Sequence, residues 1–201
     1  MRGVILLNGE RYCGKINTDD AFVVCCDGAV RWAEDAGIRF DLVVGDFDSL
    51  GYVPEKALVF PCEKDSTDGE IAMDELLKRD ISVIEIYGGG GGREDHFFGN
   101  VALLVKAYEK GKKAVFATNY SEFYIIDGLE RLTGCVGATI SVFLLGGEIR
   151  FKKSHGVKYG MDGLVIRLGE SRGISNVVLL DDAYIDVAEG FGLLFKIKKE
   201  I

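Results

Sequence analysis

The chain is predicted to be an α/β protein, with an N-terminal open, mostly parallel sheet flanked by helices and a C-terminal all-β sandwich or jelly-roll-like domain. In the first half, short apolar runs alternate with helical patterns, and in the second half short strands are punctuated by glycine. Alternating strands and helices favour a helix-covered sheet, whereas a series of short strands favours a sandwich. The pattern changes after Asp127-Gly128, so we expect domains at residues 1–127 and 128–201.

The expected strands of the first half are continuous apolar runs, which is typical of parallel strands buried on both faces. They lie at 4–7, 21–26, 42–44, 57–60, 83–87 and 114–117. Helices are expected at 30–36, 68–78 and 95–110. Thr67 stands three residues before Glu70, which is a capping-box pattern, and the last helix ends before Gly111.

Helical periodicity is absent from the second half, where every expected element is a strand. These strands lie at 139–145, 148–151, 164–168, 177–180, 183–187 and 193–197. Short strands with frequent glycine turns indicate a small antiparallel domain.

The composition is that of an ordered globular protein, with 48% hydrophobic and 28% charged residues and only two prolines. No apolar run approaches the ~18 residues of a membrane span. The four apolar residues after Gly3 are too few for the core of a signal peptide. We therefore expect a soluble, cytoplasmic protein with no membrane partner.

The net charge of −8, without a basic stripe, argues against a nucleic-acid partner. It also means that a phosphate substrate must be met by metal ions, backbone N–H groups and a few placed cations. A cationic organic substrate is compatible with such a surface.

The cysteines form no C-x-x-C pair, so neither a zinc site nor a redox pair is indicated. Cys25 and Cys26 are adjacent in an apolar run, and we expect buried reduced thiols in a reducing compartment. The others are Cys13, Cys62 and Cys135.

Two aspartates follow a buried strand in Gly45-Asp46-Phe47-Asp48-Ser49-Leu50. Alternate residues of an extended chain project the same way, so Asp46 and Asp48 are expected on one side. The carboxyl end of a strand is where open α/β sheets bind ligands, and carboxylates together with substrate phosphates bind Mg²⁺. The alternative is that the two aspartates only form an Asx-type turn.

A second acidic cluster is Lys64-Asp65-Ser66-Thr67-Asp68-Gly69-Glu70. Asp68 and Glu70 fall in the first turn of an expected helix, beside backbone N–H groups suited to phosphate. The helix dipole favours carboxylates there in any case, and Thr67 or Asp65 could simply cap the helix.

The third block joins five glycines, 88–92, to Arg93-Glu94-Asp95-His96. Glycines let the backbone turn sharply, and successive N–H groups can form an anion-binding nest. Arg93 adds a planar guanidinium for phosphate. The block is neither a Walker loop nor a dinucleotide fingerprint. We assign neither His96 nor His155 to catalysis.

These three blocks, in this order and spacing, resemble the signature blocks of thiamine pyrophosphokinases. The resemblance continues in Gly156-Val157-Lys158-Tyr159 and in Gly173-Ile174-Ser175-Asn176. It implies a catalytic α/β domain, a β domain that helps to hold thiamine, and a homodimer with sites at the subunit interface.

The resemblance also implies roles for individual residues. The catalytic set would be Asp46, Asp48, Asp68, Arg93 and Asp95, and its first three members would organise Mg²⁺ and the phosphates. ATP as co-substrate would contact Asp27, Gly28, Lys64, Asp65, Thr67, Gly91, Gly92 and Asn100. Tyr159 would stack on the thiamine pyrimidine, with Ser175 and Asn176 nearby.

One block departs from the family pattern Ala-Asp-Gly-Gly-Ala-Asn. Here it reads Cys26-Asp27-Gly28-Ala29-Val30-Arg31, so Ala29 and Arg31 replace a glycine and an asparagine. The question of whether this loop contacts nucleotide is therefore left open.

The implied function is transfer of the pyrophosphoryl group of Mg·ATP to the hydroxyl of thiamine, which gives thiamine pyrophosphate and AMP. One alternative is a phosphatase of the haloacid-dehalogenase type, because Asp46-x-Asp48 follows a buried strand; it leaves the glycine–Arg93 loop and the β domain unexplained. Another is a non-catalytic module that senses nucleotide or thiamine. Turnover of ATP to AMP separates this module from an enzyme.

Overall fold

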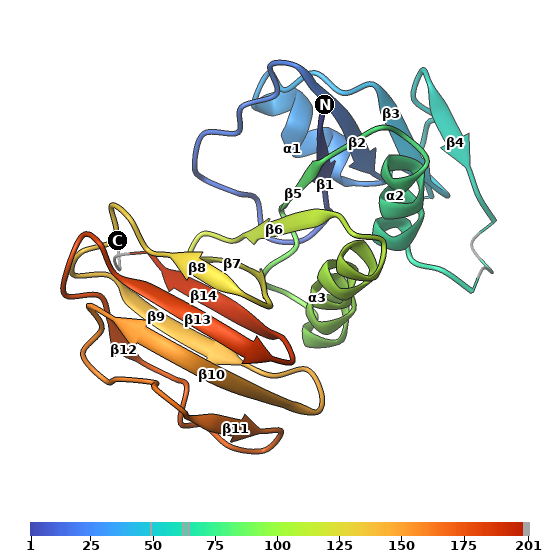
Figure 1. Cartoon of the computed structure of the whole chain (residues 1–201). Helices are drawn as coiled ribbons and strands as arrows, with labels where there is room; N and C mark the ends of the chain where they lie inside the picture. Colours follow the sequence, from blue (N-terminus) through green and yellow to red (C-terminus); the bar gives the residue numbers. More distant parts are fainter. Residues whose placement is uncertain (49, 62, 64, 199–201) are drawn as a thin grey trace. The chain divides into compact units, whose positions relative to one another are not determined.

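The chain divides into two units, Met1–Asn119 and Tyr120–Ile201 (Figure 1). The computed structural model describes residues 1–48, 50–61, 63 and 65–198. The expected boundary after residue 127 falls inside the second unit. The reason is that β7 (Ser121–Ile126) pairs along its whole length with the last strand of that unit. An α/β first unit and an all-β second unit are confirmed.

Unit 1 is built on a parallel sheet, and each neighbouring pair of its strands runs in the same direction. Apolar residues dominate the central strands, and their burial on both faces agrees with the pattern expected of a parallel sheet. The order across the sheet is β6 (Lys113–Ala117), β5 (Val83–Tyr87), β1 (Arg2–Leu6), β2 (Ala21–Cys26), β3 (Leu42–Gly45) and β4 (Ala57–Val59).

Helices cover both faces of this sheet. On one face, Val4 and Leu6 share a hydrophobic cluster with Val30 and Trp32 of α1 (Ala29–Asp35). On the other face, a Cβ added to Gly3 would lie 2.8 Å from Leu76 Cδ1 of α2 (Asp68–Leu77). This alternation along β1 follows from the two-residue period of a strand.

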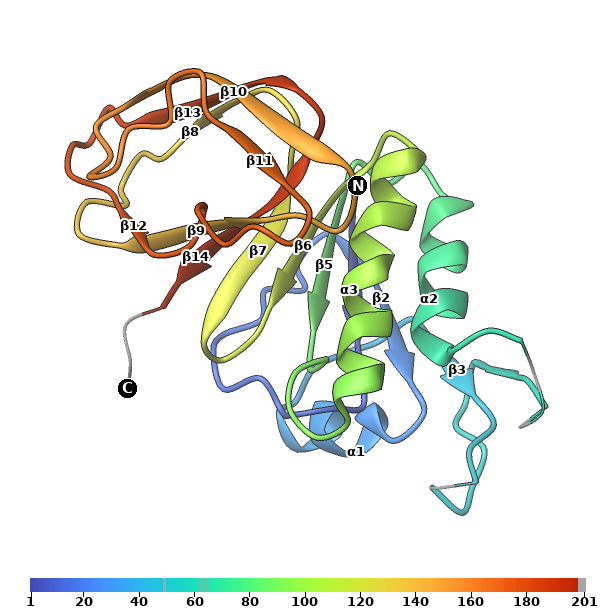
Figure 2. The same cartoon turned by 90° about the horizontal axis from the view of Figure 1, so that it is seen from below.

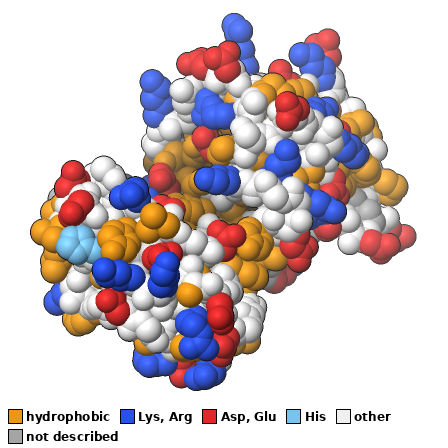
Figure 3. All heavy atoms as spheres, viewed as in Figure 1, with side chains coloured by type: hydrophobic (Ala, Val, Ile, Leu, Met, Phe, Trp, Pro, Cys, Tyr) orange, Lys and Arg blue, Asp and Glu red, His pale blue; other side chains and the backbone are white. Residues whose placement is uncertain are grey.

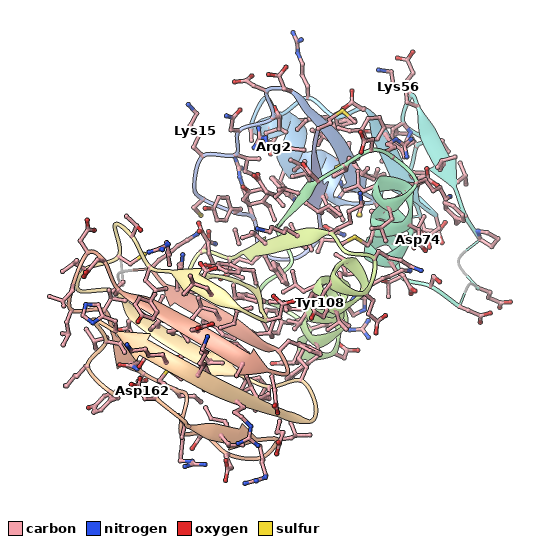
Figure 4. The ribbon with its side chains drawn as sticks, viewed as in Figure 1. Arg2, Lys15, Lys56, Asp74, Tyr108 and Asp162 are labelled. Atoms are coloured by element: carbon pink, nitrogen blue, oxygen red, sulfur yellow. The ribbon has the colours of Figure 1, made fainter. Side chains whose placement is uncertain are left out.

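The helices α2 and α3 (Glu94–Glu109) lie side by side in Figures 1 and 2. Lys106 of α3 forms ion pairs with Glu70 at 3.0 Å and Asp74 at 2.7 Å, both on α2. Asp74 is labelled in Figure 4, on the side of α2 that faces α3. These ion pairs link α2 to α3.

One expected strand of unit 1 is not buried. We expected residues 57–60 to be covered on both faces, but Leu58 and Val59 of β4 are exposed. In the described part of the sheet β4 is an edge strand that pairs with β3. An edge position leaves its outer side without a neighbouring strand, so an apolar run does not guarantee burial.

Unit 2 is a sandwich of two antiparallel sheets, seen as two layers in Figure 2. One sheet has the order β12 (Asn176–Val177), β9 (Thr139–Phe143), β14 (Gly192–Ile197) and β7. The other has the order β11 (Val165–Arg167), β10 (Glu148–His155), β13 (Tyr184–Glu189) and β8 (Leu129–Arg131). Side chains that alternate along these strands, such as Ile140 and Val142 or Ile149 and Phe151, form one core.

Two strands of unit 2 were not expected from the sequence, β7 and β8. The signal for β7 is present, since Ser-Glu-Phe-Tyr-Ile-Ile combines aromatic and β-branched residues and is followed by an Asp-Gly turn. The structure describes no helix among residues 120–198, in agreement with the missing helical periodicity.

Two observations concern membrane and nucleic-acid partners: the character of the helices and the distribution of surface charge. In the described residues no helix is long and apolar enough to cross a membrane. On the face drawn in Figure 3, basic and acidic side chains are interspersed and form no continuous basic stripe.

Candidate active site

The chain reverses its direction of travel across the sheet of unit 1 at β1. From β1 it passes through β2, β3 and β4 toward one edge, then returns to place β5 on the other side of β1. In open parallel sheets, a ligand crevice forms at the carboxyl ends of strands at such a switch point. The residues after β1 and after β5 are therefore expected to contribute to a ligand site.

The two loops at this switch point are joined by backbone hydrogen bonds. The N–H of Gly9 donates to the carbonyl of Gly88 at 2.7 Å, and the N–H of Glu10 donates to that of Gly90 at 2.6 Å. A cavity of about 440 Å³ opens beside them. Its lining comes from the loops after β1, β2, β3 and β5 and from the starts of α2 and α3: Leu7, Asn8, Gly9, Cys26, Asp27, Asp46, Ser66, Thr67, Asp68, Gly69, Gly89, Gly91, Gly92, Arg93, His96 and Asn100.

The glycine loop lies directly on the sheet. A Cβ added to Gly89 would stand 2.6 Å from Phe116 Cζ and 2.7 Å from Leu7 Cδ1, so only glycine fits. Gly91 has φ +66°, a left-handed value that glycine adopts at low cost. Asn100 of α3 donates from Nδ2 to the Gly89 carbonyl at 3.3 Å. These contacts hold the backbone of the loop against the cavity.

Arg93 and Asp95 form a two-point pair at the start of α3. Arg93 donates from Nε to Asp95 Oδ1 at 3.1 Å and from a terminal nitrogen to Oδ2 at 2.6 Å. The hydrogen bonds from Arg93 lower the pKa of Asp95 to about 2, and the pKa of Arg93 is raised by the same contact. A carboxylate of such low pKa is a weak base, so Asp95 is suited to orient Arg93 rather than to accept a proton.

The chain between Asp46 and Asp48 does not have the extended form that the sequence led us to expect. Strand β3 ends at Gly45, and Phe47 has φ +63°, so the chain is not extended between the two aspartates. Phe47 is buried in the cluster beneath α1, which turns the backbone there. The N–H of Asp48 donates to Asp46 Oδ1 at 3.3 Å, as in an Asx-type turn. Asp46 lines the cavity, whereas Asp48 is exposed and outside the lining.

The loop before α2 brings a second carboxylate to the cavity. Thr67 is the N-cap, and its hydroxyl accepts a hydrogen bond from the Glu70 N–H at 3.2 Å, which confirms half of the capping box. The Glu70 carboxylate pairs with Lys106 of α3. Thr67 and Asp68 line the cavity, so the same turn both starts the helix and builds the site.

The carboxylates present fit a magnesium ion that is shared with a substrate. Within the described ranges, no three or more His, Cys, Asp or Glu side chains form a group able to hold a metal by themselves. The three-aspartate set expected from the sequence is thus not assembled as a protein-only site. Asp46 and Asp68 do line one cavity, and Mg²⁺ is commonly bound by one or two carboxylates with water and phosphate oxygens.

The residues expected to bind the organic substrate lie in unit 2. The side chain of Tyr159 is exposed, with Lys158 Nζ 5.2 Å from the centre of its ring. Asn176 is buried and hydrogen-bonded to the backbone of Tyr159. Ser175 has φ +62°, and its N–H donates to Ser141 Oγ at 3.0 Å.

Residues 13–116 match a family model described as the catalytic domain of thiamin pyrophosphokinase. The matched segment is more than half of the chain and carries most of the cavity lining. This chain belongs to the thiamin pyrophosphokinase family.

Individual relatives extend the match beyond the catalytic segment. A thiamine pyrophosphokinase of Bacillus subtilis is 28% identical over 172 residues, which cover 81% of this chain and 80% of that protein. A crystal structure of thiamine pyrophosphokinase from Bacillus subtilis has a TM-score of 0.84 at 23% identity, over 99% of both chains. Another, from Geobacillus thermodenitrificans, has a TM-score of 0.80 at 25% identity, over 100% of this chain and 99% of that one.

The cavity brings together about half of the site residues that the sequence analysis predicted. Those that line it are Asp27, Asp46, Thr67, Asp68, Gly91, Gly92, Arg93 and Asn100. Gly28, Asp48, Asp65 and Asp95 are outside the lining, and Lys64 lies outside the described residues, as do Ser49 and Cys62. The departures from the family pattern are also outside it: Ala29 is buried and Arg31 is exposed.

Several lining residues were not assigned to the site from the sequence. Asn8 had a usable signal, because it is the first polar residue after a buried strand. His96 was left unassigned but lines the cavity. Cys26 lines it as well, while its neighbour Cys25 faces the cluster beneath α1, where burial raises the pKa of its thiol to about 12.

Proposed function

We propose that this chain is a thiamine diphosphokinase that transfers the pyrophosphoryl group of Mg·ATP to the hydroxyl of thiamine. One observation carries the proposal. The segment that matches the family's catalytic domain contains a cavity at a sheet switch point, lined by Asp46, Asp68, a glycine loop and Arg93. This combination suits a polyphosphate substrate that must bind to a protein of net charge −8. A haloacid-dehalogenase-type phosphatase would leave the family match without explanation.

In the reaction, the hydroxyl oxygen of thiamine attacks the β-phosphorus of ATP. A bond forms between these two atoms, and the bond from the β-phosphorus to the oxygen that bridges it to the α-phosphorus breaks. AMP leaves with that oxygen, and the hydroxyl proton is released to an acceptor or to water. The products are thiamine pyrophosphate and AMP. Such transfers depend on positioning and charge neutralisation more than on covalent chemistry.

The glycine loop and Arg93 would hold the phosphates of ATP. Backbone N–H groups of a glycine-rich turn bind anions, and the guanidinium adds two parallel donors. Asp95 would orient Arg93 before substrate binds, through the two hydrogen bonds between them. Asn100 would hold the glycine loop in position, because its side-chain amide donates a hydrogen bond to the Gly89 carbonyl.

Asp46 and Asp68 would hold Mg²⁺ together with the phosphates. The ion would neutralise the charge on the transferring group. The two carboxylates come from different segments of the cavity lining, one after β3 and one at the start of α2. Asp48 was expected to share this role, but it lies outside the cavity lining.

For thiamine, we propose that Tyr159 stacks on the pyrimidine, with Ser175 and Asn176 nearby. The ring of Tyr159 is exposed and attracts a cation within its own chain, the Lys158 ammonium at 5.2 Å. Aromatic faces of this kind bind flat cationic heterocycles. We further propose a cytoplasmic homodimer. Within the described residues Cys25 and Cys26 are in no disulfide, which is compatible with a reducing compartment.

The activity is tested by incubating the purified chain with ATP, MgCl₂ and thiamine. We expect AMP and thiamine pyrophosphate in equal amounts, and no AMP when thiamine is omitted. ADP would indicate transfer of a single phosphoryl group, and inorganic phosphate alone would indicate a hydrolase. Binding of ATP or thiamine without any turnover would favour a sensing module.

The homodimer is tested by sedimentation and by subunit mixing. Chains with Arg93→Ala are mixed with chains with Tyr159→Ala under conditions that allow subunit exchange. If sites are shared between subunits, mixed dimers regain one intact site, and activity at limiting thiamine rises above the mean of the two parents. A monomeric protein, or activity equal to that mean, would contradict the proposal.

A further inference from the structure

Residues 156–164 form a loop between β10 and β11 that carries Tyr159. The loop starts beside the segment that contains β12. Leu179 donates from its N–H to the Gly156 carbonyl at 2.7 Å, and Lys158 donates to the Val177 carbonyl at 2.8 Å. Val157 and Val178 form an isolated antiparallel bridge. Up to Lys158, therefore, the loop is held by the backbone of β12 and of the two residues after it.

At Tyr159 the hydrogen bonds to the loop come from the side chain of Asn176 instead of from backbone groups. Asn176 Oδ1 accepts from the Tyr159 N–H at 2.9 Å, and Nδ2 donates to the Tyr159 carbonyl at 2.7 Å. A side-chain amide has the same donor and acceptor as a peptide group, so it extends the ladder by one residue. The left-handed φ of +62° at Ser175 turns the backbone away at this point.

Most hydrogen-bonding groups of the Asn176 side-chain amide are already used within the protein, so few remain for a ligand. Oδ1 also accepts from the Val177 N–H at 2.9 Å, so both of its lone pairs are used. One hydrogen of Nδ2 is committed to Tyr159, and Asn176 as a whole is 6% exposed. The side chain of Tyr159, by contrast, is turned outward, with 57% of the residue exposed.

The far side of the loop has its own anchor. Asp162, labelled in Figure 4, accepts from the Ser154 N–H at 2.7 Å and from the Ser154 hydroxyl at 3.0 Å. The same hydroxyl accepts from the Met161 N–H at 2.7 Å. Tyr159 thus lies between two sets of bonds, and those made by Asn176 are the ones that reach its own peptide groups.

We propose that Asn176 is a positioning residue for thiamine, which acts through the backbone of Tyr159 instead of contacting the substrate. The inference rests on the proposed function, in which Tyr159 stacks on the pyrimidine. It gives Asn176 a defined role: the amide fixes the position of the Tyr159 ring before thiamine binds, which lowers the ordering cost of stacking.

A double-mutant cycle tests this role. Asn176→Ala, Tyr159→Ala and the double variant are compared with the unchanged chain for the KM of thiamine, the KM of ATP and kcat. We expect each single variant to raise the thiamine KM about fivefold, since one aromatic contact is lost. The double variant should have the same thiamine KM as Tyr159→Ala alone. The KM of ATP should stay unchanged in all three.

A matched control is Asn119→Ala in unit 1. Asn119 makes the same kind of clamp, accepting from the Cys13 N–H at 2.8 Å and donating to the Arg11 carbonyl at 3.0 Å. We expect its loss to leave the thiamine KM unchanged. Asn176→Asp, which keeps the acceptor but loses the donor, is the second variant if Asn176→Ala does not fold. The Asn176→Asp variant should also raise the thiamine KM, because the hydrogen bond to the Tyr159 carbonyl is lost.

The outcomes are distinguishable. Multiplicative effects in the double variant would mean that Asn176 contacts thiamine itself, and an unchanged thiamine KM in a folded Asn176 variant would overturn the role altogether. Calorimetric titration of thiamine without ATP separates the two proposals. If the unchanged chain binds thiamine and the cycle holds for the dissociation constant, positioning stands even where turnover is absent. If it neither turns over nor binds thiamine, both proposals fail.

Discussion

At the scale of single residues, Asp46 and Asp48 show how one backbone angle separates two neighbours with the same side chain. The left-handed φ of Phe47 leaves Asp46 in the cavity lining and Asp48 outside it. We expect Asp46→Asn to lower kcat by about 100-fold, the order of effect of losing one charge-stabilising group. Steady-state kinetics with saturating Mg²⁺ measures it, and circular dichroism checks the fold.

Asp48→Asn is the matched comparison for this prediction. An extended chain would give both aspartates equal effects, whereas the observed turn predicts a smaller loss for Asp48→Asn. Equal losses in two folded variants would show that Asp48 reaches the reacting groups when substrate is bound. Near-normal activity of Asp46→Asn would exclude Asp46 as a metal ligand.

Arg93 and Asp95 give a prediction about pH. The folded pKa of Asp95, about 2, lies below the ordinary value of 3.8, so the pair is fully present above about pH 4 and is lost only as the pH falls toward 2. Titration of Asp95 should therefore contribute nothing to the pH–rate profile between about pH 6 and 9. Asp95→Asn should raise the KM of ATP while both limbs of this profile keep their positions.

Arg93→Lys tests the guanidinium itself. A lysine keeps the charge but cannot make two parallel hydrogen bonds, so kcat/KM for ATP should fall by about tenfold or more. Because Asp95 acts through Arg93, Asp95→Asn should add little in the Arg93→Lys background. Wild-type kinetics of Arg93→Lys at limiting ATP would remove Arg93 from the phosphate site.

At the scale of elements, the glycine loop separates positions that need glycine from one that does not. A Cβ at Gly89 would overlap the buried Phe116 ring, so Gly89→Ala should lower the free energy of unfolding by about 1–3 kcal/mol. A Cβ at Gly90 would come no closer than 3.4 Å to Thr118. Gly90→Ala should therefore change the free energy of unfolding by less than about 0.5 kcal/mol. Urea denaturation compares the two, and equal effects would contradict the packing.

Helix α2 was located from its cap. Thr67 three residues before Glu70 predicted the start at residue 68, and the structure has both the cap and the start there. By contrast, the apolar run of β4 resembled a buried strand, although its place at the sheet edge leaves it exposed. A cap acts over four residues and is visible locally, whereas an edge position depends on which strands are neighbours.

At the scale of the whole molecule, two units carry different parts of the proposed site. The residues proposed to bind ATP lie in unit 1, and Tyr159, proposed to bind thiamine, lies in unit 2. Tyr159→Ala should raise the KM of thiamine several-fold, for a loss of about 1 kcal/mol, and leave the KM of ATP unchanged. Tyr159→Trp, which keeps a flat aromatic face, is the control. An unchanged thiamine KM in a stable Tyr159→Ala protein would contradict the role of unit 2.

By itself, the sequence determined the α/β and all-β halves, the positions of most strands along the chain, the cap of α2 and the glycine–Arg93 loop. Each of these depends on contacts or backbone preferences within a few residues, which a local pattern records. Only the tertiary structure decided that Asp46 and Asp68 share a cavity with Asn8 and His96, and that Asp48 does not. It also decided that Asn176 bonds to the backbone of Tyr159. These arrangements bring together residues that are distant in the chain. They depend on strand order in the sheets and on burial, which no short segment encodes.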